Sequence, residues 1–349
     1  PLKPIEDFKY IGKAIPRVDL HDKVVGSPIF GIDVELPDML HASVVRPDRV
    51  DATLKSCDST EAEKMPGVIK VVIEDDFIGV IAESHFQAEM ARKALKVEWA
   101  INQTWNLEDI VGMTKVGQGE ATVIQKAGDT DELLEEAESN EVLSLEFSSP
   151  IGAHAQLEPN GATAIVKDGK ATVWLSTQVP AVTLNEVADR LGMDKDNVNI
   201  IPQYLGGGFG RRLHTPNAMQ AAVMSQAVDG RPVKSFFDRK QEFQNDTFRP
   251  PTHHVMRGRL DESGNIAALE HSFSSGDVAF NSAIFPAAAR PVIGADIGAI
   301  RGGMIMYRNI PNIKATSWHV DLPFATSWWR SLGLLANTFA IESFVDELA

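Results

Sequence analysis

Cysteine is nearly absent from this sequence, since Cys57 is the only one among 349 residues. One thiol cannot form a disulfide within the chain, and it cannot build a thiolate zinc site or an iron–sulfur cluster. We therefore interpret Cys57 as a small apolar residue or a surface thiol. Any electron-transfer cluster that the function requires must come from another chain.

Long apolar runs and an excess of positive charge are also missing. No run approaches the roughly 18 residues that a membrane-spanning helix needs, and the opening residues 1–4 show no signal-like apolar core. The 33 basic and 48 acidic residues give a formal net charge of −15, which repels nucleic acid and anionic membranes. We expect no membrane-spanning segment and no nucleic-acid partner.

Familiar catalytic motifs are absent as well. There is no G-x-S-x-G elbow and no H-E-x-x-H, and His253 and His254 are adjacent rather than one helical turn apart. The chain therefore offers no zinc site, and we expect no residue of it to ligate a metal directly. With 44% hydrophobic residues it reads as a globular protein of two or three domains.

The most informative feature that is present is a glycine-rich loop, in which Gly206, Gly207, Gly208, Phe209 and Gly210 precede Arg211 and Arg212. Glycines let backbone N–H groups approach a ligand, and the two arginines add positive charge for a phosphate or a small anion. The loop follows a strand-like run at 198–201 and precedes a helix that opens at Thr215-Pro216. It fits neither the P-loop nor the dinucleotide fingerprint, so a tight turn that serves only packing remains the alternative.

The surrounding pattern mixes strands with helices, which predicts an α+β fold. We expect strands at 40–45, 68–73 and 79–82, and hairpins at 162–175 and 256–269. Capping-box spacing predicts helices that begin near Ser84 and Thr183, the second ending at Gly192. Residues 100–140 are polar and read as an irregular surface connector, with an acidic helix at 131–138.

The glycine loop resembles that of the large molybdenum-binding subunit in the xanthine dehydrogenase and aldehyde oxidoreductase family. The segment W-L-S-T-Q-V-P at 174–180 is similar to the W-x-S-T-Q-x-P of that family, and R-S-L-G at 330–333 is similar to its R-x-x-G loop. Residues 337–349 resemble a family helix that ends in D-E-L-A. The double arginine, and Arg-Ser in place of Arg-Gly, point to the isoquinoline 1-oxidoreductase β-subunit branch. Similarity extends from about Tyr10 to the last residue.

This resemblance implies a domain order. An α/β hammerhead domain would occupy 10–104, a connector 105–142, and the first part of a molybdopterin-binding domain 143–349. The cofactor would be molybdopterin or its cytosine dinucleotide form, bound by the glycine loop together with Arg211 and Arg212.

The resemblance also implies roles for single residues. Gln178 would hydrogen-bond beside the molybdenum centre, Phe209 and Gly210 would face it, and Arg330 would lie near cofactor and substrate. Without the resemblance, Gln178 reads as a turn residue and Arg330 as half of a surface ion pair. His154 and Glu158 would support the site rather than bind metal, and we expect the pair Trp328-Trp329 to pack in the core rather than to line a substrate funnel.

The implied reaction is the hydroxylation of an N-heterocycle or an aldehyde with oxygen from water. Leu213 stands where purine-oxidising members carry a glutamate, which favours a more apolar substrate. The implied partners are an iron–sulfur small subunit and the C-terminal half of the large subunit, in the bacterial periplasm or cytoplasm. Because the general-base glutamate belongs to that half, we expect this chain alone to be inactive and to bind no cofactor. The alternatives are a non-catalytic module that only assembles with a partner, and an unrelated phosphate-binding protein.

Overall fold

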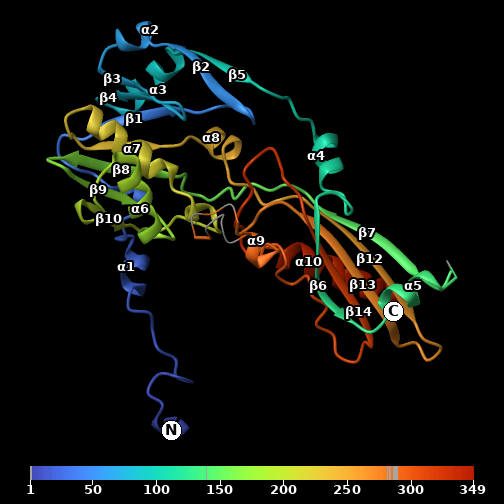
Figure 1. Cartoon of the computed structure of the whole chain (residues 1–349). Helices are drawn as coiled ribbons and strands as arrows, with labels where there is room; N and C mark the ends of the chain where they lie inside the picture. The colour runs from blue at the N-terminus through green and yellow to red at the C-terminus, as the bar shows by residue number, and fades with distance from the viewer. Residues whose placement is uncertain (1, 139, 281, 283, 286–289) are drawn as a thin grey trace.

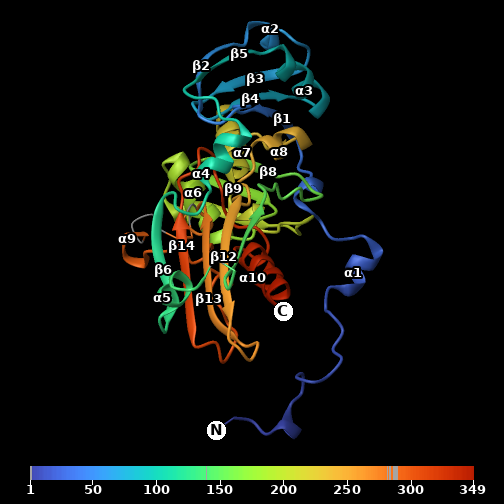
Figure 2. The same ribbon diagram turned by 90° about the vertical axis from the view of Figure 1, so that its right-hand side faces the viewer.

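The structure is a computed structural model that describes residues 2–138, 140–280, 282, 284–285 and 290–349. Two sheets, of seven and of five strands, form the body, and a separate pair of strands forms a third, smaller sheet. In Figure 1 the seven-stranded sheet lies to the left and the five-stranded sheet extends to the lower right, while residues 2–28 form an arm that leaves the body (Figures 1 and 2).

The seven-stranded sheet combines early and late parts of the chain. Its order is β10-β9-β8-β11-β1-β4-β3, and β1 pairs in parallel with β11, with Leu40 opposite Val233. Strands of the expected hammerhead domain and of the expected cofactor domain therefore share one sheet. The strands are β1 (Leu40–Val45), β3 (Val68–Ile73), β4 (Ile78–Ala82), β8 (Gly161–Lys167), β9 (Lys170–Leu175), β10 (Val198–Pro202) and β11 (Val233–Phe236).

Helices α6 (Pro180–Leu191) and α7 (Pro216–Ala227) pack on this sheet through small side chains. Ala218 and Ala222 of α7 are fully buried with the alanines and valines of β8 and β9 in one apolar cluster. Short side chains let the helix backbone come close to the strands, which places the loops before both helices at one edge of the sheet. The remaining helices near this sheet are α2 (Thr60–Glu63), α3 (His85–Ala94) and α8 (Arg239–Gln244).

The expected helix ends are correct in part. The Ser84 side chain caps α3 by accepting the backbone N–H of Gln87, and Gly192 ends α6 with a φ of 62°. The predicted start of α6 at Thr183 was wrong, because the helix begins at Pro180, whose ring suits the first helical position. Thr183 lies within the helix, and its hydroxyl donates to the carbonyl of Val179 at 3.1 Å.

The five-stranded sheet has the order β6-β14-β13-β12-β7 and packs against the C-terminal helix α10 (Leu334–Leu348). Met256, Leu269, Ile341 and Phe344 form the centre of its core. The predicted hairpin at 256–269 is confirmed by the antiparallel pairing of β12 with β13. The strands are β6 (Glu120–Ala127), β7 (Leu143–Ser149), β12 (Thr252–Leu260), β13 (Ile266–Ser275) and β14 (Asn312–His319).

Strand β6 corrects the expectation that residues 100–140 are irregular. It pairs with β14 along the edge of the sheet and has no fully buried residue. An exposed edge strand needs no apolar alternation, so its sequence gives no signal of a strand. The other short elements are η1 (Ile5–Asp7), α1 (Leu20–Val25), η2 (Gly31–Asp33), β2 (Ala52–Asp58), β5 (Lys96–Ile101), α4 (Leu107–Met113), α5 (Thr130–Glu135), η3 (Lys195–Asn197), η4 (Arg211–Leu213) and α9 (Arg290–Ile293).

Candidate functional site

The glycine loop and Gln178 lie together because β9 and β10 are parallel neighbours. Parallel strands end at the same edge of a sheet, so residues 176–178 after β9 and 203–210 after β10 emerge side by side. The Gly210 N–H donates to Gln178 Oε1 at 3.2 Å, across 32 positions of sequence. The Gln178 backbone N–H in turn donates to the carbonyl of Arg212 at 3.1 Å. The expected proximity of Gln178 to the loop is therefore present.

The segment that carries Arg330 joins the same place from the other sheet. Its backbone N–H donates to the Phe209 carbonyl at 2.7 Å. A Cβ on Gly210 would collide with the carbonyl oxygen of Trp328, so only glycine allows this close approach. The side chains of Gln178, Phe209 and Arg330 are all exposed, which leaves them free to meet a ligand. Three segments predicted from sequence thus converge on one surface.

Both loops contain residues in the left-handed backbone region. Phe209 has a φ of 57°, Ser331 of 78° and Leu332 of 57°. Each such non-glycine residue costs about 1–3 kcal/mol and persists only where the surroundings impose it. This kind of strain is common at binding and catalytic sites, and three of the nine such residues in the described chain lie where the two loops meet.

The glycines themselves have packing reasons within the protein. A Cβ on Gly206 would collide with Glu158, and one on Gly208 would lie 2.7 Å from Gln178 Oε1. These contacts support the alternative of a tight turn that serves packing. Within the described residues, however, the N–H groups of Gly207, Gly208 and Phe209 donate to no protein acceptor. Successive free N–H groups are a common feature of anion sites, so the loop also fits a phosphate-bearing ligand.

Arg212 does not present its charge to a ligand, because its side chain is only 1% exposed. Its Nη2 donates to Glu158 Oε2 at 2.8 Å, and its Nε donates to the Gly207 carbonyl at 2.7 Å. Burial, the largest influence, lowers the pKa of Arg212, while the Glu158 charge opposes that shift. The free positive charge that we expected here is instead the internal support of the loop.

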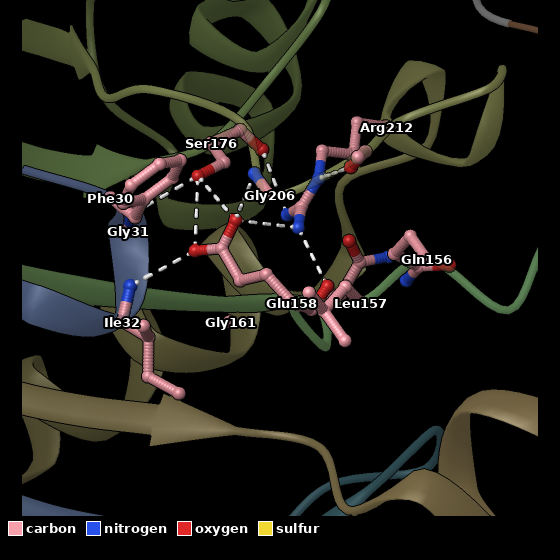
Figure 3. Close-up of polar contacts among 12 residues, drawn as sticks. Phe30, Gly31, Ile32, Gln156, Leu157, Glu158, Gly161, Ser176, Gly206 and Arg212 are labelled. Atoms are coloured by element: carbon pink, nitrogen blue, oxygen red, sulfur yellow. Dashed lines mark hydrogen bonds and ion pairs between the residues drawn. The ribbon is translucent and has the colours of Figure 1, made fainter. Parts of the chain in front are cut away.

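Glu158 is the centre of this support (Figure 3). Its carboxylate accepts the N–H of Ile32 at 3.0 Å, the N–H of Gly206 at 2.8 Å and the hydroxyl of Ser176 at 3.1 Å, in addition to Arg212. It therefore joins the chain before β1 to the loops after β9 and β10. The supporting place expected for Glu158 agrees with these contacts.

Arg211 is buried in the same layer and also differs from expectation. Its Nε lies 2.9 Å from Asp246 Oδ1 and 3.5 Å from Glu242 Oε2. Glu242 also accepts the N–H of Asn160 at 2.6 Å. Glu242 and Asp246 were not among the predicted residues, because neither belongs to a recognisable motif. The only available signal was the pair of arginines, which required buried carboxylates if they did not face solvent.

The helix after the loop begins where expected, since α7 starts at Pro216 with Thr215 at its N-cap position, but its surroundings differ. The short turn η4 separates the glycine loop from α7, and the Thr215 hydroxyl donates to Glu186 Oε2 at 3.1 Å instead of capping α7. The N-terminus of α7 is therefore set back from the loop. The pair Trp328-Trp329 is half-buried rather than in the core, and Trp329 packs on the His154 ring, with centroids 5.6 Å apart. In the described part of the chain, no three His, Cys, Asp or Glu residues are grouped to hold a metal ion, and no helix is long and apolar enough to cross a bilayer.

Comparison with known proteins identifies the relatives of this chain. The family model described as the molybdopterin cofactor-binding domain matches residues 115–349. A nicotinate dehydrogenase subunit of Pseudomonas putida is 30% identical over 361 residues, which cover 100% of this chain and 30% of that protein. The beta subunit of isoquinoline 1-oxidoreductase from Brevundimonas diminuta is 27% identical over 360 residues, covering 100% of this chain and 46% of that protein.

Among solved structures, the aldehyde oxidoreductase of Desulfovibrio gigas matches with a TM-score of 0.77 at 20% identity, over 95% of this chain and 41% of that one. At this identity the likeness supports the fold alone. The chain spans less than half the length of these three relatives. The predicted resemblance and the α+β fold class are both confirmed.

Proposed function

We propose that this chain, which belongs to the molybdopterin cofactor-binding domain family, supplies part of the cofactor site of a molybdenum hydroxylase. Its homologues are molybdopterin-dependent oxidoreductases, and this chain corresponds to only part of them. The observation that carries the proposal is the meeting of Gln178, Phe209 and Arg330 on one surface. The Gly210 N–H donates to the Gln178 side chain at 3.2 Å, and the Arg330 N–H donates to the Phe209 carbonyl at 2.7 Å. That meeting requires both sheets in their correct arrangement.

The residues present fit a molybdopterin group. The free N–H groups at Gly207, Gly208 and Phe209 suit the phosphate of a pterin or of its cytosine dinucleotide form. Gln178 Oε1 accepts from Gly210, so its amide NH2 is the part left to donate toward the cofactor. Arg211 and Arg212 hold the loop from beneath rather than touch the group with their side chains. When bound, the cofactor supplies the redox and metal chemistry of hydroxylation.

The roles of this chain are orientation and hydrogen bonding. Gln178 would donate a neutral hydrogen bond beside the metal without adding charge, and the exposed Arg330 side chain would steer a substrate toward the same surface. Leu213, half-buried directly after the arginines, provides no charged partner for a purine. We therefore propose an N-heterocycle or an aldehyde as substrate, in keeping with the names of the relatives. The general base is expected from the remaining part of the large subunit.

The proposed partners are that remaining part and an iron–sulfur small subunit, since Cys57 alone cannot hold a cluster. The proposed compartment is the bacterial periplasm or cytoplasm. The second candidate function is a non-catalytic module that assembles with a partner chain but turns over nothing. The chain matches 46% of the beta subunit of isoquinoline 1-oxidoreductase, so catalysis by the parent protein is itself a proposal. The reading frame after Ala349 in the parent gene distinguishes the two, because a downstream Gly-Glu segment favours an enzyme.

Elemental analysis tests the proposal directly. The parent protein, expressed with its partner subunit, should contain about one molybdenum per large subunit, whereas this chain expressed alone should contain almost none. Each lost hydrogen bond to a charged group weakens binding by about 1.5–3 kcal/mol, so the loss of several abolishes retention. A parent protein without molybdenum would contradict the proposal. Stoichiometric molybdenum in the isolated chain would show that the site is more self-contained than proposed.

A further inference from the structure

His154 lies beneath the candidate site with both ring nitrogens facing hydrogen-bond acceptors. Its Nδ1 is 3.0 Å from each carboxylate oxygen of Asp246, and its Nε2 is 2.6 Å from the carbonyl oxygen of Trp328. Its side chain is 0% exposed. A neutral imidazole carries only one N–H, so it would leave one of these short contacts between two lone pairs. Only the imidazolium can donate to both.

A proton on Asp246 would be the other way to satisfy the Nδ1 contact. Burial, the largest influence, raises the pKa of Asp246, but the hydrogen bond from His154 and the charge of Arg211 together lower it. The carboxylate also accepts the backbone N–H of His154 at 2.6 Å and lies 2.9 Å from Arg211 Nε. A carboxyl group surrounded by donors is ionised, so the shared proton belongs to the histidine.

The charges of the buried layer agree with this assignment. Glu158, Glu242 and Asp246 are three carboxylates no more than 5% exposed, and Arg211 and Arg212 are the two guanidinium groups paired with them. Arg212 pairs with Glu158, whereas Arg211 is shared between Glu242 and Asp246. A proton on His154 gives the Asp246 carboxylate a second cationic neighbour, which offsets the cost of burying that charge.

Other charged groups face this layer. Arg46 interacts with the charges of Glu242, Asp238 and Asp246, and burial lowers its pKa to about 10. Asp238 in turn pairs with Arg92 at 2.9 Å. Arg92 also contacts Glu89 at 3.1 Å, so Arg92 is shared between two acids.

His214 is the other histidine of the region. Burial first, then the charges of Arg211 and His154, lower the pKa of His214 to about 4. Its Nε2 lies 2.7 Å from the Ser327 hydroxyl and contacts no carboxylate among the described residues. His214 is therefore neutral and provides an internal comparison for His154.

We infer that His154 is an imidazolium in the folded protein and is the positioning residue that fastens the Arg330 segment to the glycine loop. Its Nε2–H holds the Trp328 carbonyl against Gly210, two residues before the Arg330 N–H that donates to Phe209. Its Nδ1–H is tied to Asp246, and through Asp246 to Arg211 at the end of the loop. Loss of the proton would set a nitrogen lone pair against an acceptor and release one of the two loops. The importance of these loops rests on the proposed function, whereas the protonation state does not.

Nitrogen-15 NMR of the chain labelled at histidine tests the protonation state at pH 7. His154, identified by its absence in His154→Gln, should show two protonated ring nitrogens, while His214 should show one protonated and one bare nitrogen. A bare ring nitrogen on His154 would overturn the inference. The measurement does not require His154→Gln to fold, because the His154 signals can also be identified through backbone assignment. It needs no cofactor either, so failure of the proposed function would leave its result unchanged.

Amide hydrogen exchange tests the positioning role. In His154→Gln, the Arg330 amide should exchange about 10 to 100 times faster, the range expected for the loss of one hydrogen bond to a charged group, while amides in β12 and β13 keep their rates. In His154→Lys, which restores a cation with several donors, Arg330 should exchange within about threefold of the original rate. Equal exchange at Arg330 in all three proteins would refute the role. Equal acceleration in both variants would refute the need for a cation. If His154→Gln fails to fold, wild-type exchange decides, since unprotected Arg330 would also refute the role.

Discussion

The Glu158 carboxylate offers the sharpest test of how the site is held together. Replacement by glutamine keeps the size of the side chain but turns one acceptor oxygen into a donor NH2. Both carboxylate oxygens of Glu158 accept N–H donors: Oε1 faces Ile32, and Oε2 faces Gly206 and Arg212. In either orientation of the amide, the new NH2 group therefore points at an N–H group. No rotamer flip repairs the network.

The expected cost follows from burial. Glu158 and Arg212 have side chains 5% and 1% exposed, so the substitution leaves a guanidinium without its counter-charge in the interior. Removing one partner of such a pair destabilises proteins by about 3–5 kcal/mol, most of it the penalty for the abandoned charge. We expect Glu158→Gln to lower the free energy of unfolding by about 3 kcal/mol or more. Exchange at the Gly206 amide should accelerate as well.

Urea denaturation followed by circular dichroism and tryptophan fluorescence measures the change. Glu61→Gln is the matched control, because Glu61 pairs with Lys64 at 3.0 Å on the surface, with both side chains more than 60% exposed. The control should cost less than about 1 kcal/mol. A similarly small cost for Glu158→Gln would refute the reasoning, since it would mean that the pair is solvated or that the loop is supported by other contacts.

Three further outcomes are expected. Gln178→Ala, in the full-length enzyme, should lower turnover about 10 to 100-fold. The unfolding free energy of this chain should fall by only about 0.5–1.5 kcal/mol, the usual worth of the one hydrogen bond lost, from the Gly210 N–H to Gln178 Oε1. Unchanged turnover at full molybdenum content would speak against the role of Gln178. Gly210→Ala should destabilise the chain by more than about 1 kcal/mol, because Gly210 has a φ of 109° and lies against Trp328. The control Gly112→Ala, with open space around it inside α4, should be neutral or stabilising. Equal effects of the two substitutions in urea titrations would contradict the prediction for Gly210. Burial lowers the pKa of His271 to about 4, so between about pH 6.5 and 5 the unfolded chain binds more protons than the folded chain. Stability should therefore fall as pH falls, by up to about 1.4 kcal/mol per pH unit. A His271→Phe variant with the same slope of stability against pH would exclude this histidine as the cause.

Part of the fold could be predicted because its signals are local. The cap at Ser84, the stop at Gly192 and the hairpin turns depend on residues within a few positions of each other, and these predictions are correct. Edge strand β6 was not predictable in this way, since its form depends on pairing with β14 almost two hundred positions later. The parallel pairing of β1 with β11 is hidden for the same reason.

The sequence by itself determined where to look: the glycine loop stood out from its residue types, whereas the motif around Gln178 and the segment of Arg330 were recognisable through the resemblance to a known family. Only the tertiary structure decided what each side chain faces. It turned Arg211 and Arg212 inward onto the carboxylates of distant segments, and it placed His154 between two acceptors. The reason is that motif spacing constrains backbone geometry locally, whereas burial, ion pairing and protonation depend on which distant groups share the same low-dielectric interior.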